Sequence, residues 1–268
     1  MTPRGMGGRL VGAGLGAWFL VPLVPLIVWA LADRWTWPAV LPQRWGLRGW
    51  STFGADGMGS ALVASTLLGG AVAVGATPLG ALAGRALGWH RTPRPGVVTT
   101  VLLAPVALPP FAVAMGADAV LLRTGLPAPA AVVLLLVVFA LPYTTTVYRA
   151  GYAGLDERVE EQARMLGAGP RQAFVRVTFP ALRGATATAA AVAFLVGAGD
   201  YIVTVVVGGG RVVTAPVLVA ASASGPGNEP TAAAYALTSV APLALVALAA
   251  AVLARRRRGS VTGAEGRR

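Results

Sequence analysis

Six apolar stretches, each of about 20 residues or more, constrain this chain more than any other feature. About 20 consecutive apolar residues are needed for an α-helix to cross the hydrocarbon core of a bilayer. Only 12 % of the residues are charged, against about 25 % in a typical soluble domain, and the mean hydropathy is +0.69. The sequence therefore predicts an all-α, polytopic membrane protein with six transmembrane helices, at residues 10–31, 58–87, 96–117, 129–149, 184–207 and 231–254.

The distribution of arginine predicts how these spans are oriented. The chain contains no lysine, and 17 of its 22 basic residues lie at the two ends or in segments 85–95 and 149–183. Cytoplasmic segments of membrane proteins are enriched in arginine and lysine. We therefore expect a multi-pass protein of the cell inner (plasma) membrane with both termini cytoplasmic. Its parts are a short N-terminus at 1–9, a transmembrane domain at 10–254, and a basic disordered tail at 255–268, which we interpret as a topology anchor and not as a nucleic-acid site.

Two features of the N-terminal region, its first apolar stretch and the loop after it, each allow two interpretations. The first apolar stretch exceeds the roughly 7–15 residues of a signal-peptide core, which favours a span over a cleaved leader. The loop that follows, residues 33–57, concentrates tryptophan. These side chains suit either an interfacial aromatic belt or an aromatic platform that binds sugar rings, and they are Trp35, Trp37, Trp45 and Trp50.

The composition disfavours catalysis by this chain. It has no cysteine and a single histidine, His90, so we predict no metal site, and we find no Ser-His-Asp arrangement or other catalytic residues. The ATP-binding pattern G-x4-G-K-[ST] requires a lysine, which the chain lacks. We therefore expect a chain without a cofactor of its own, which supplies a pathway while another protein supplies the energy.

Residues 155–180, LDERVEEQARMLGAGPRQAFVRVTFP, form the longest charge-rich stretch, and we call them the polar segment. A stretch this polar is not tolerated in hydrocarbon, so it must fold on one aqueous side. Asp156 is suited to cap a first helix, Gly167 to end it, and Pro170 to begin a second helix. Apolar residues keep helical spacing in both halves, at Val159, Ala163 and Leu166 and at Ala173, Phe174 and Val177.

The spacing of particular residues in the polar segment is specific. Three residues separate Glu161-Gln162-Ala163 from Gly167, and nine more precede Val177, which is followed by Thr178, Phe179 and Pro180. This arrangement resembles the EAA loop of binding-protein-dependent ABC importer permeases, whose pattern is E-A-A, x3, G, x9, I-x-L-P. The departures at Val177 and Phe179 conserve hydrophobicity. Gln162 places a larger polar group where a small residue is usual. A looser resemblance covers roughly residues 41–253.

The resemblance implies a fold similar to type I ABC importer permeases, with a cytoplasmic coupling helix that docks on a separate ATPase. By this resemblance Glu161 contacts a basic residue of the ATPase, Gly167 shapes the turn, and Ala163 and Leu166 form the packed face. The implied partners are a cytoplasmic ATPase dimer that binds ATP and Mg, a second permease subunit, identical or related, and an extracytoplasmic solute-binding protein.

A second resemblance concerns the solute. Residues 194–210, FLVGAGDYIVTVVVGGG, followed by Ala215-Pro216-Val217, resemble the corresponding run in permeases for polyamines, thiamine, ferric iron and sulfate. Polyamine-like members often carry an aspartate at the place of Asp200, and an acidic side chain suits a cationic solute. We therefore expect a small polar or charged solute such as a polyamine, with thiamine, ferric iron, sulfate or phosphonate as alternatives.

Asp200 is the one acidic residue that the predicted spans contain. A carboxylate inside a membrane is costly unless it faces protein or water, so Asp200 has either a pathway role or a structural one, and both remain open. Further pathway candidates are Tyr201 and the residues that interrupt the third span, Pro105 and Pro109. A rival class is an ion-coupled secondary transporter or channel that uses Asp200, and the polar segment argues against it.

Overall fold

The computed structural model describes residues 12, 14–18, 20–36, 38–51, 53, 57–89 and 91–255. Contacts divide the chain into two compact units. The first comprises Met1–Ala61 and Ala215–Ala241, and the second comprises Leu62–Thr214 and Pro242–Arg268. The predicted N-terminus at 1–9 and the tail beyond Arg255 lie outside the described residues, as do residues 10, 11, 13 and 19 of the first predicted span. The described part of that span is not one continuous helix, because a turn at Val21 and Pro22 precedes the helix Leu23–Ala30.

The first unit contains a small β-hairpin where the sequence analysis expected only a loop. Strands β1 (Ala32–Arg34) and β2 (Arg44–Trp45) pair antiparallel. The Asp33 carboxylate holds the turn region together, because it accepts a hydrogen bond from the Arg48 amide at 3.1 Å and pairs with Arg44 Nε at 3.7 Å. The helices of this unit are α2 (Leu23–Ala30), α3 (Arg48–Ser51) and α12 (Ala215–Ala223).

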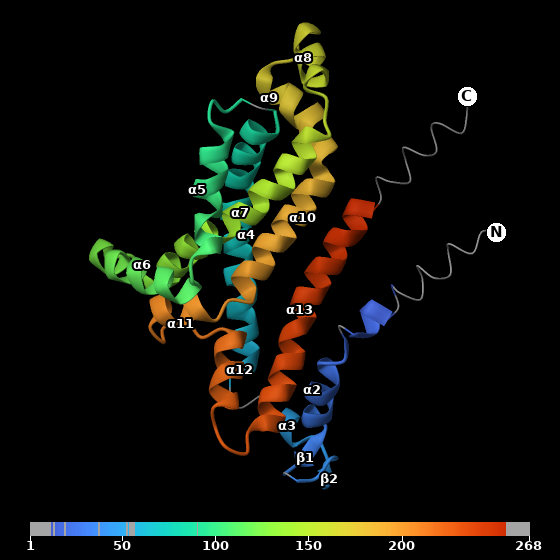
Figure 1. The fold of residues 1–268 in the computed structure, drawn as a ribbon, viewed down its shortest axis with the longest axis vertical. Helices are drawn as coiled ribbons and strands as arrows, with labels where there is room; N and C mark the ends of the chain where they lie inside the picture. The colour runs from blue at the N-terminus through green and yellow to red at the C-terminus, as the bar shows by residue number, and fades with distance from the viewer. Residues whose placement is uncertain are drawn as a thin grey trace, which may run out of the picture. The chain divides into compact units, whose positions relative to one another are not determined.

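The described residues of the second unit form helices joined by short connections, with no strand among them. In Figure 1 its long helices α4, α7 and α10 run alongside one another, and α8 and α9 lie together at one end. Its elements are α4 (Met58–Gly88, whose first turn belongs to the first unit), α5 (Pro95–Ala107), α6 (Pro110–Thr124), α7 (Ala128–Ala153), α8 (Glu157–Met165), α9 (Pro170–Ala173), the π-helical turn η1 (Phe174–Thr178), α10 (Phe179–Ala198) and α11 (Ile202–Gly208). Helix α13 (Glu229–Arg255) is shared by both units.

A stripe of glycines lets α4 approach α7 closely. A Cβ at Gly84 would lie 2.5 Å from the Cβ of Tyr148, and a Cβ at Gly88 would lie 2.7 Å from that of Tyr152. Gly75 and Gly80 face α7 in the same way, and the partners on α7 follow the same order along the chain. The two helices therefore run parallel in tight contact, as small residues permit between membrane helices.

Among the described residues, four helical stretches are long and apolar enough to cross a membrane, and a bent pair of helices forms a fifth candidate. The four are Met58–Gly88, Ala128–Ala153, Pro170–Ala198 and Glu229–Ala254. This confirms the prediction of an all-α membrane protein.

Two predicted spans differ from the structure in detail. The third is bent by 98° between Pro95–Ala107 and Pro110–Thr124, because Pro109 and Pro110 lack amide donors and Pro109 restricts the residue before it. The fifth begins within the polar segment, where the helical stretch Pro170–Ala198 starts. That stretch stops before Asp200, and the chain resumes as α11.

Candidate functional site

Both helices of the polar segment begin where its sequence predicts, and the second continues through Pro180 into α10 instead of ending there. Asp156 caps α8, since its carboxylate accepts a hydrogen bond from the Arg158 amide at 3.0 Å. Gly167 ends the helix with a φ of 91°, a left-handed conformation that glycine adopts readily and other residues rarely do. Pro170 then occupies the first turn of α9, where its missing amide costs no hydrogen bond.

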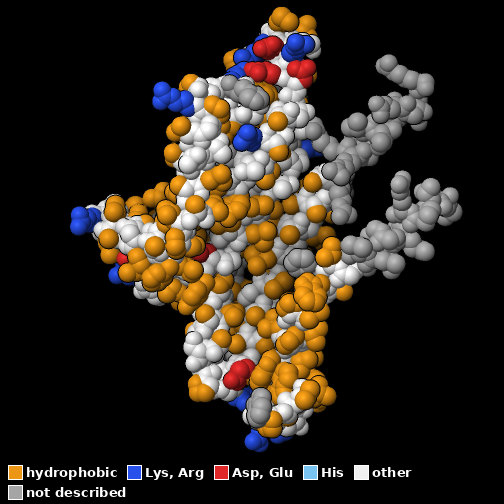
Figure 2. All heavy atoms as spheres, viewed as in Figure 1, with side chains coloured by type: hydrophobic (Ala, Val, Ile, Leu, Met, Phe, Trp, Pro, Cys, Tyr) orange, Lys and Arg blue, Asp and Glu red, His pale blue; other side chains and the backbone are white. Residues whose placement is uncertain are grey.

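The tip of α8 presents apolar side chains to solvent. Met165 is 81 % exposed and Leu166 is 90 % exposed, although both are large hydrophobic residues. Glu161 and Gln162 are exposed beside them, and Ala163 is half-buried. Figure 2 shows acidic and basic side chains gathered over the end of the second unit that carries α8. An apolar tip within a charged surface is typical of a surface that binds another protein.

The remaining residues predicted in the polar segment lie at its other end. Val177 is half-buried within η1, and Pro180 is exposed in the first turn of α10. They therefore belong to the helix that leaves the polar segment and not to the tip that carries Leu166. A π-helical turn is rare, and such turns are frequent at functional sites.

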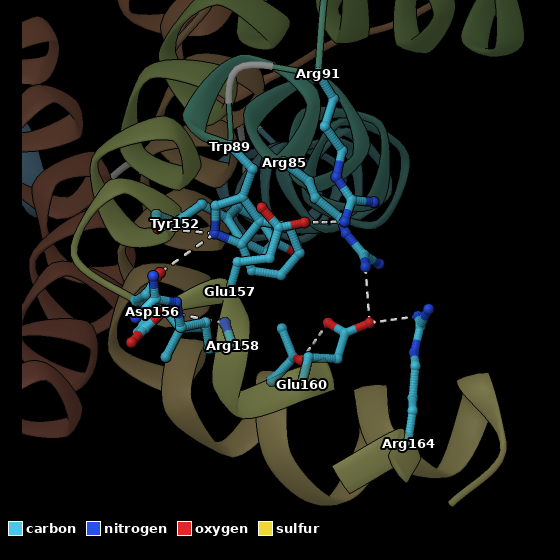
Figure 3. Close-up of polar contacts among 11 residues, drawn as sticks. Arg85, Trp89, Arg91, Tyr152, Asp156, Glu157, Arg158, Glu160 and Arg164 are labelled. Atoms are coloured by element: carbon cyan, nitrogen blue, oxygen red, sulfur yellow. Dashed lines mark hydrogen bonds and ion pairs between the residues drawn. The ribbon is translucent and has the colours of Figure 1, made fainter. Parts of the chain in front are cut away.

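Glu160, the neighbour of the predicted contact residue Glu161, organises the polar segment from within. It is only 4 % exposed. Its Oε1 accepts hydrogen bonds from Arg85 at 2.8 Å and from Arg164 at 2.6 Å (Figure 3), and its Oε2 accepts one from the Thr178 hydroxyl at 2.8 Å. Burial acts to raise the pKa of Glu160, but the hydrogen bond from Thr178 and the charges of Arg85 and Arg164 outweigh it and lower that pKa.

The end of α4 contacts the polar segment at more than one point. The Trp89 indole donates hydrogen bonds to the carbonyls of Tyr152 at 3.1 Å and Leu155 at 3.3 Å, and the Arg85 guanidinium lies 4.8 Å from the centre of the Trp89 ring. Arg91 pairs with Glu157 in the first turn of α8, as Figure 3 shows. Together these contacts fasten α8 and the end of α7 to the end of α4.

The sequence analysis missed this arrangement. It used the arginines of residues 85–95 only to orient the spans, and it selected Glu161 as the important acid. One signal was available, because Glu160 and Arg164 are four residues apart and lie on one face of a helix. The partner Arg85 lies 75 residues from Glu160, and no local pattern indicates that pairing.

Asp200 lies in the break between α10 and α11. Its Oδ2 accepts hydrogen bonds from the Thr204 amide at 2.8 Å and the Thr204 hydroxyl at 3.1 Å, so the side chain caps α11. It also lines a pocket of about 180 Å³ together with Pro105, Pro110 and Tyr143. Of the predicted pathway residues, the structure thus brings Asp200 and Pro105 together. Tyr201 is exposed, and neither Tyr201 nor Pro109 is among the residues that line this pocket.

The tryptophan-rich region of the first unit forms a separate hollow. The Trp29 and Trp35 rings pack with their centres 4.7 Å apart, and both line a pocket of about 640 Å³ with Asp33, Arg44 and Glu229. Trp45 is exposed, and Trp37 lies outside the described residues. Among the described residues no cluster of three or more histidine, cysteine, aspartate or glutamate side chains could hold a metal ion.

Comparison with known proteins identifies the family. Residues 76–259 match the family of binding-protein-dependent transport system inner membrane components, and because the match covers more than half of the chain, the protein belongs to that family. A comparison with curated proteins gave no match. The fold is similar to a bacterial ABC transporter involved in the import of the acidic polysaccharide alginate, with a TM-score of 0.59 and 15 % identity over 93 % of this chain and 97 % of that one. At this identity the likeness shows the fold alone.

The fold and the family define the class of this protein. It is a permease subunit of an ABC importer, with the fold of type I permeases, and is a transport subunit rather than an enzyme. Membership of the family also implies that an ATPase and a substrate-binding protein work with it.

Proposed function

We propose that this permease forms half of a solute pathway and that the tip of α8 docks on a cytoplasmic ATPase. The observation that carries the proposal is the exposure of Met165 and Leu166, the two apolar side chains at the tip. Leu166 would enter an apolar groove on the ATPase, and exposed Glu161 would pair with a basic residue at its rim. Burying a leucine of this size contributes about 1.5–3 kcal/mol, which makes Leu166 the main anchor.

The remaining residues of the polar segment have supporting roles in this proposal. Gly167 holds the turn that presents Leu166, and Ala163 allows close approach of the ATPase. Gln162, exposed beside the tip, adjusts the fit to one particular ATPase. Val177 and Pro180 connect the segment to α10, so that movement of the tip reaches the membrane helices.

The assembly follows from what this chain lacks. Without a lysine it has no ATP-binding loop of the G-x4-G-K-[ST] type, so ATP and Mg would be bound by the partner ATPase, which we propose to be a dimer. A second permease subunit, identical or related, completes the pathway, and a solute-binding protein delivers the solute from outside. The arginine distribution supports a cytoplasmic position for the polar segment and for both termini.

For the solute we propose a small polar or charged molecule such as a polyamine. Support comes from Asp200, which lines a pocket together with residues of α5, α6, α7, α10 and α11. Thiamine, ferric iron, sulfate and phosphonate remain alternatives within the family. The ion-coupled transporter or channel is not favoured, since the chain belongs to a family of binding-protein-dependent systems.

The docking proposal is tested with the double variant Glu161→Arg and Gly167→Pro. Proline cannot adopt the φ of 91° at residue 167, so the tip is displaced, and arginine repels a basic contact. We expect the variant to insert in the membrane but to lose co-purification of the ATPase. An exposed arginine elsewhere, changed in Arg94→Gln, serves as the control. Retention of both the ATPase and uptake by the double variant would show that the tip is not the docking surface.

A further inference from the structure

We propose that α4 receives the movement of the polar segment directly, through Glu160, with Arg85 as the positioning residue on α4. This inference rests on the proposed docking of α8 on an ATPase. Helices α7 and α10 flank the polar segment in sequence and would move with it in any case. Helix α4 is separated from it by α5, α6 and α7, so its participation is a property of the folded structure alone.

The contacts at Glu160 make α8 and the end of α4 a single body. The carboxylate is buried and binds Arg85 of α4, Arg164 of α8 and Thr178 of η1. A buried charge left without its partner is strongly disfavoured, so α8 does not separate from α4 without disrupting the bond to Arg85. The pairing of Arg91 with Glu157 adds a second connection between the chain after α4 and the first turn of α8.

Helix α4 is built to carry such a movement into the membrane. It comprises 31 residues, which corresponds to a length of about 46 Å. Its glycine stripe packs against α7, and in the middle third of the helix Gly69 packs against α10, where an added Cβ would lie 2.8 Å from the Cβ of Ala198. Closely packed helices shift as units and do not deform continuously. A displacement at Arg85 is therefore transmitted to the level of Gly69.

The π-helical turn η1 connects the Glu160 carboxylate to α10. Thr178, which is fully buried, is the last residue of η1 and bonds Oε2 of Glu160. One side chain of α8 thus contacts the end of α4 through Oε1 and the start of α10 through Oε2. We infer that Glu160 sets the position of both helices relative to the docking tip.

The test measures movement of α4 in the assembled transporter. The chain has no cysteine, so spin labels attach only at cysteines that are introduced. We choose two exposed positions for them, Leu67→Cys on α4 and Leu122→Cys on α6. The distance between the labels is measured by pulsed electron resonance in the complex with its ATPase, without nucleotide and after trapping with MgATP and vanadate. We expect trapping to shift this distance, and Arg85→Gln or Glu160→Gln to abolish most of the shift while the ATPase still co-purifies.

Two further variants separate positioning from simple stability. Arg85→Lys keeps the positive charge and is expected to retain most of the shift, and Arg94→Gln, an exposed arginine after α4, is expected to retain all of it. A full shift in Arg85→Gln and Glu160→Gln would overturn the inference, as would a label pair that does not move in the unsubstituted chain. Loss of ATPase association in these variants would also overturn it, because Glu160 would then act in docking. If the unsubstituted chain itself fails to bind the ATPase, the docking proposal fails instead.

Discussion

Glu160 and Asp200 are both acids that accept several hydrogen bonds, yet the structure uses them differently. The partners of Glu160 lie 4, 18 and 75 residues away and include two arginines. The side-chain hydrogen bonds of Asp200 come from Val203 and Thr204, three and four residues away, and no arginine is among them. Glu160 therefore connects three parts of the fold, whereas Asp200 caps only α11, the helix that directly follows it in the sequence.

The difference bears on how each acid should be tested. A buried carboxylate paired with two arginines leaves unpaired charges behind when it is removed, which is a large cost. A carboxylate that caps a helix leaves one amide without a partner, which is a small cost. Loss of function at Asp200 is therefore easier to separate from loss of stability.

The largest effect on stability is expected when the side chains of Glu160 and Asp200 are removed in two separate variants and the losses are compared. We expect Glu160→Ala to lower the free energy of unfolding by about 3–5 kcal/mol, since Arg85 and Arg164 lose their partner. We expect Asp200→Ala to lower it by about 1 kcal/mol. Thermal unfolding of the two purified variants in detergent checks this order. Equal losses of unfolding free energy in the two variants would mean that the contact between Glu160 and Arg85 stabilises the fold no more than a helix cap does.

A smaller effect on stability, with a larger effect on transport, is expected for Asp200→Asn. Asparagine keeps a side-chain acceptor for the Thr204 amide, so the cap survives at a cost of a few tenths of a kcal/mol. If Asp200 faces a cationic solute, removing its charge reduces uptake of that solute while the unfolding temperature is nearly unchanged. Spermidine uptake into vesicles provides the measurement. An unchanged uptake rate would assign Asp200 to the helix cap alone.

The smallest effect concerns pH. The pKa of Glu160 in the folded protein lies below its ordinary value of 4.5, so its ionised form stabilises the fold above that value. This contribution is lost as the pH falls below about 4.5 and through the lower pKa of the folded state. We therefore expect the stability difference between the unsubstituted chain and Glu160→Gln to shrink over this range. A difference that stays constant with pH would show that the charge of Glu160 does not stabilise the fold.

The sequence predicted the parts of this structure that depend on local chemistry. Apolar length identified α4 to within one residue of its end, and the cap at Asp156, the turn at Gly167 and the start at Pro170 all follow from backbone preferences of those residues. It did not predict the hairpin at Asp33, helix α12 or the bond between Arg85 and Glu160. Those features depend on residues that meet only after folding, or on short elements with little periodicity.

The choice between neighbouring acids shows the same limit. In the sequence Glu160 and Glu161 are equivalent in type, and the family pattern favours Glu161. In the structure Glu161 is exposed while Glu160 is buried. We therefore assign the two acids different roles: Glu161 is available to a partner protein, and Glu160 is bound to α4.

The central claim is that the tip of α8 contacts the ATPase, and a single introduced cysteine tests it most directly. Leu166→Cys, labelled with a photoreactive maleimide in the assembled complex, is predicted to form a covalent adduct with the ATPase on illumination. Leu122→Cys on α6, which is also an exposed leucine, is predicted to form none. An adduct from Leu122→Cys, or none from Leu166→Cys in a complex that retains its ATPase, would contradict the account.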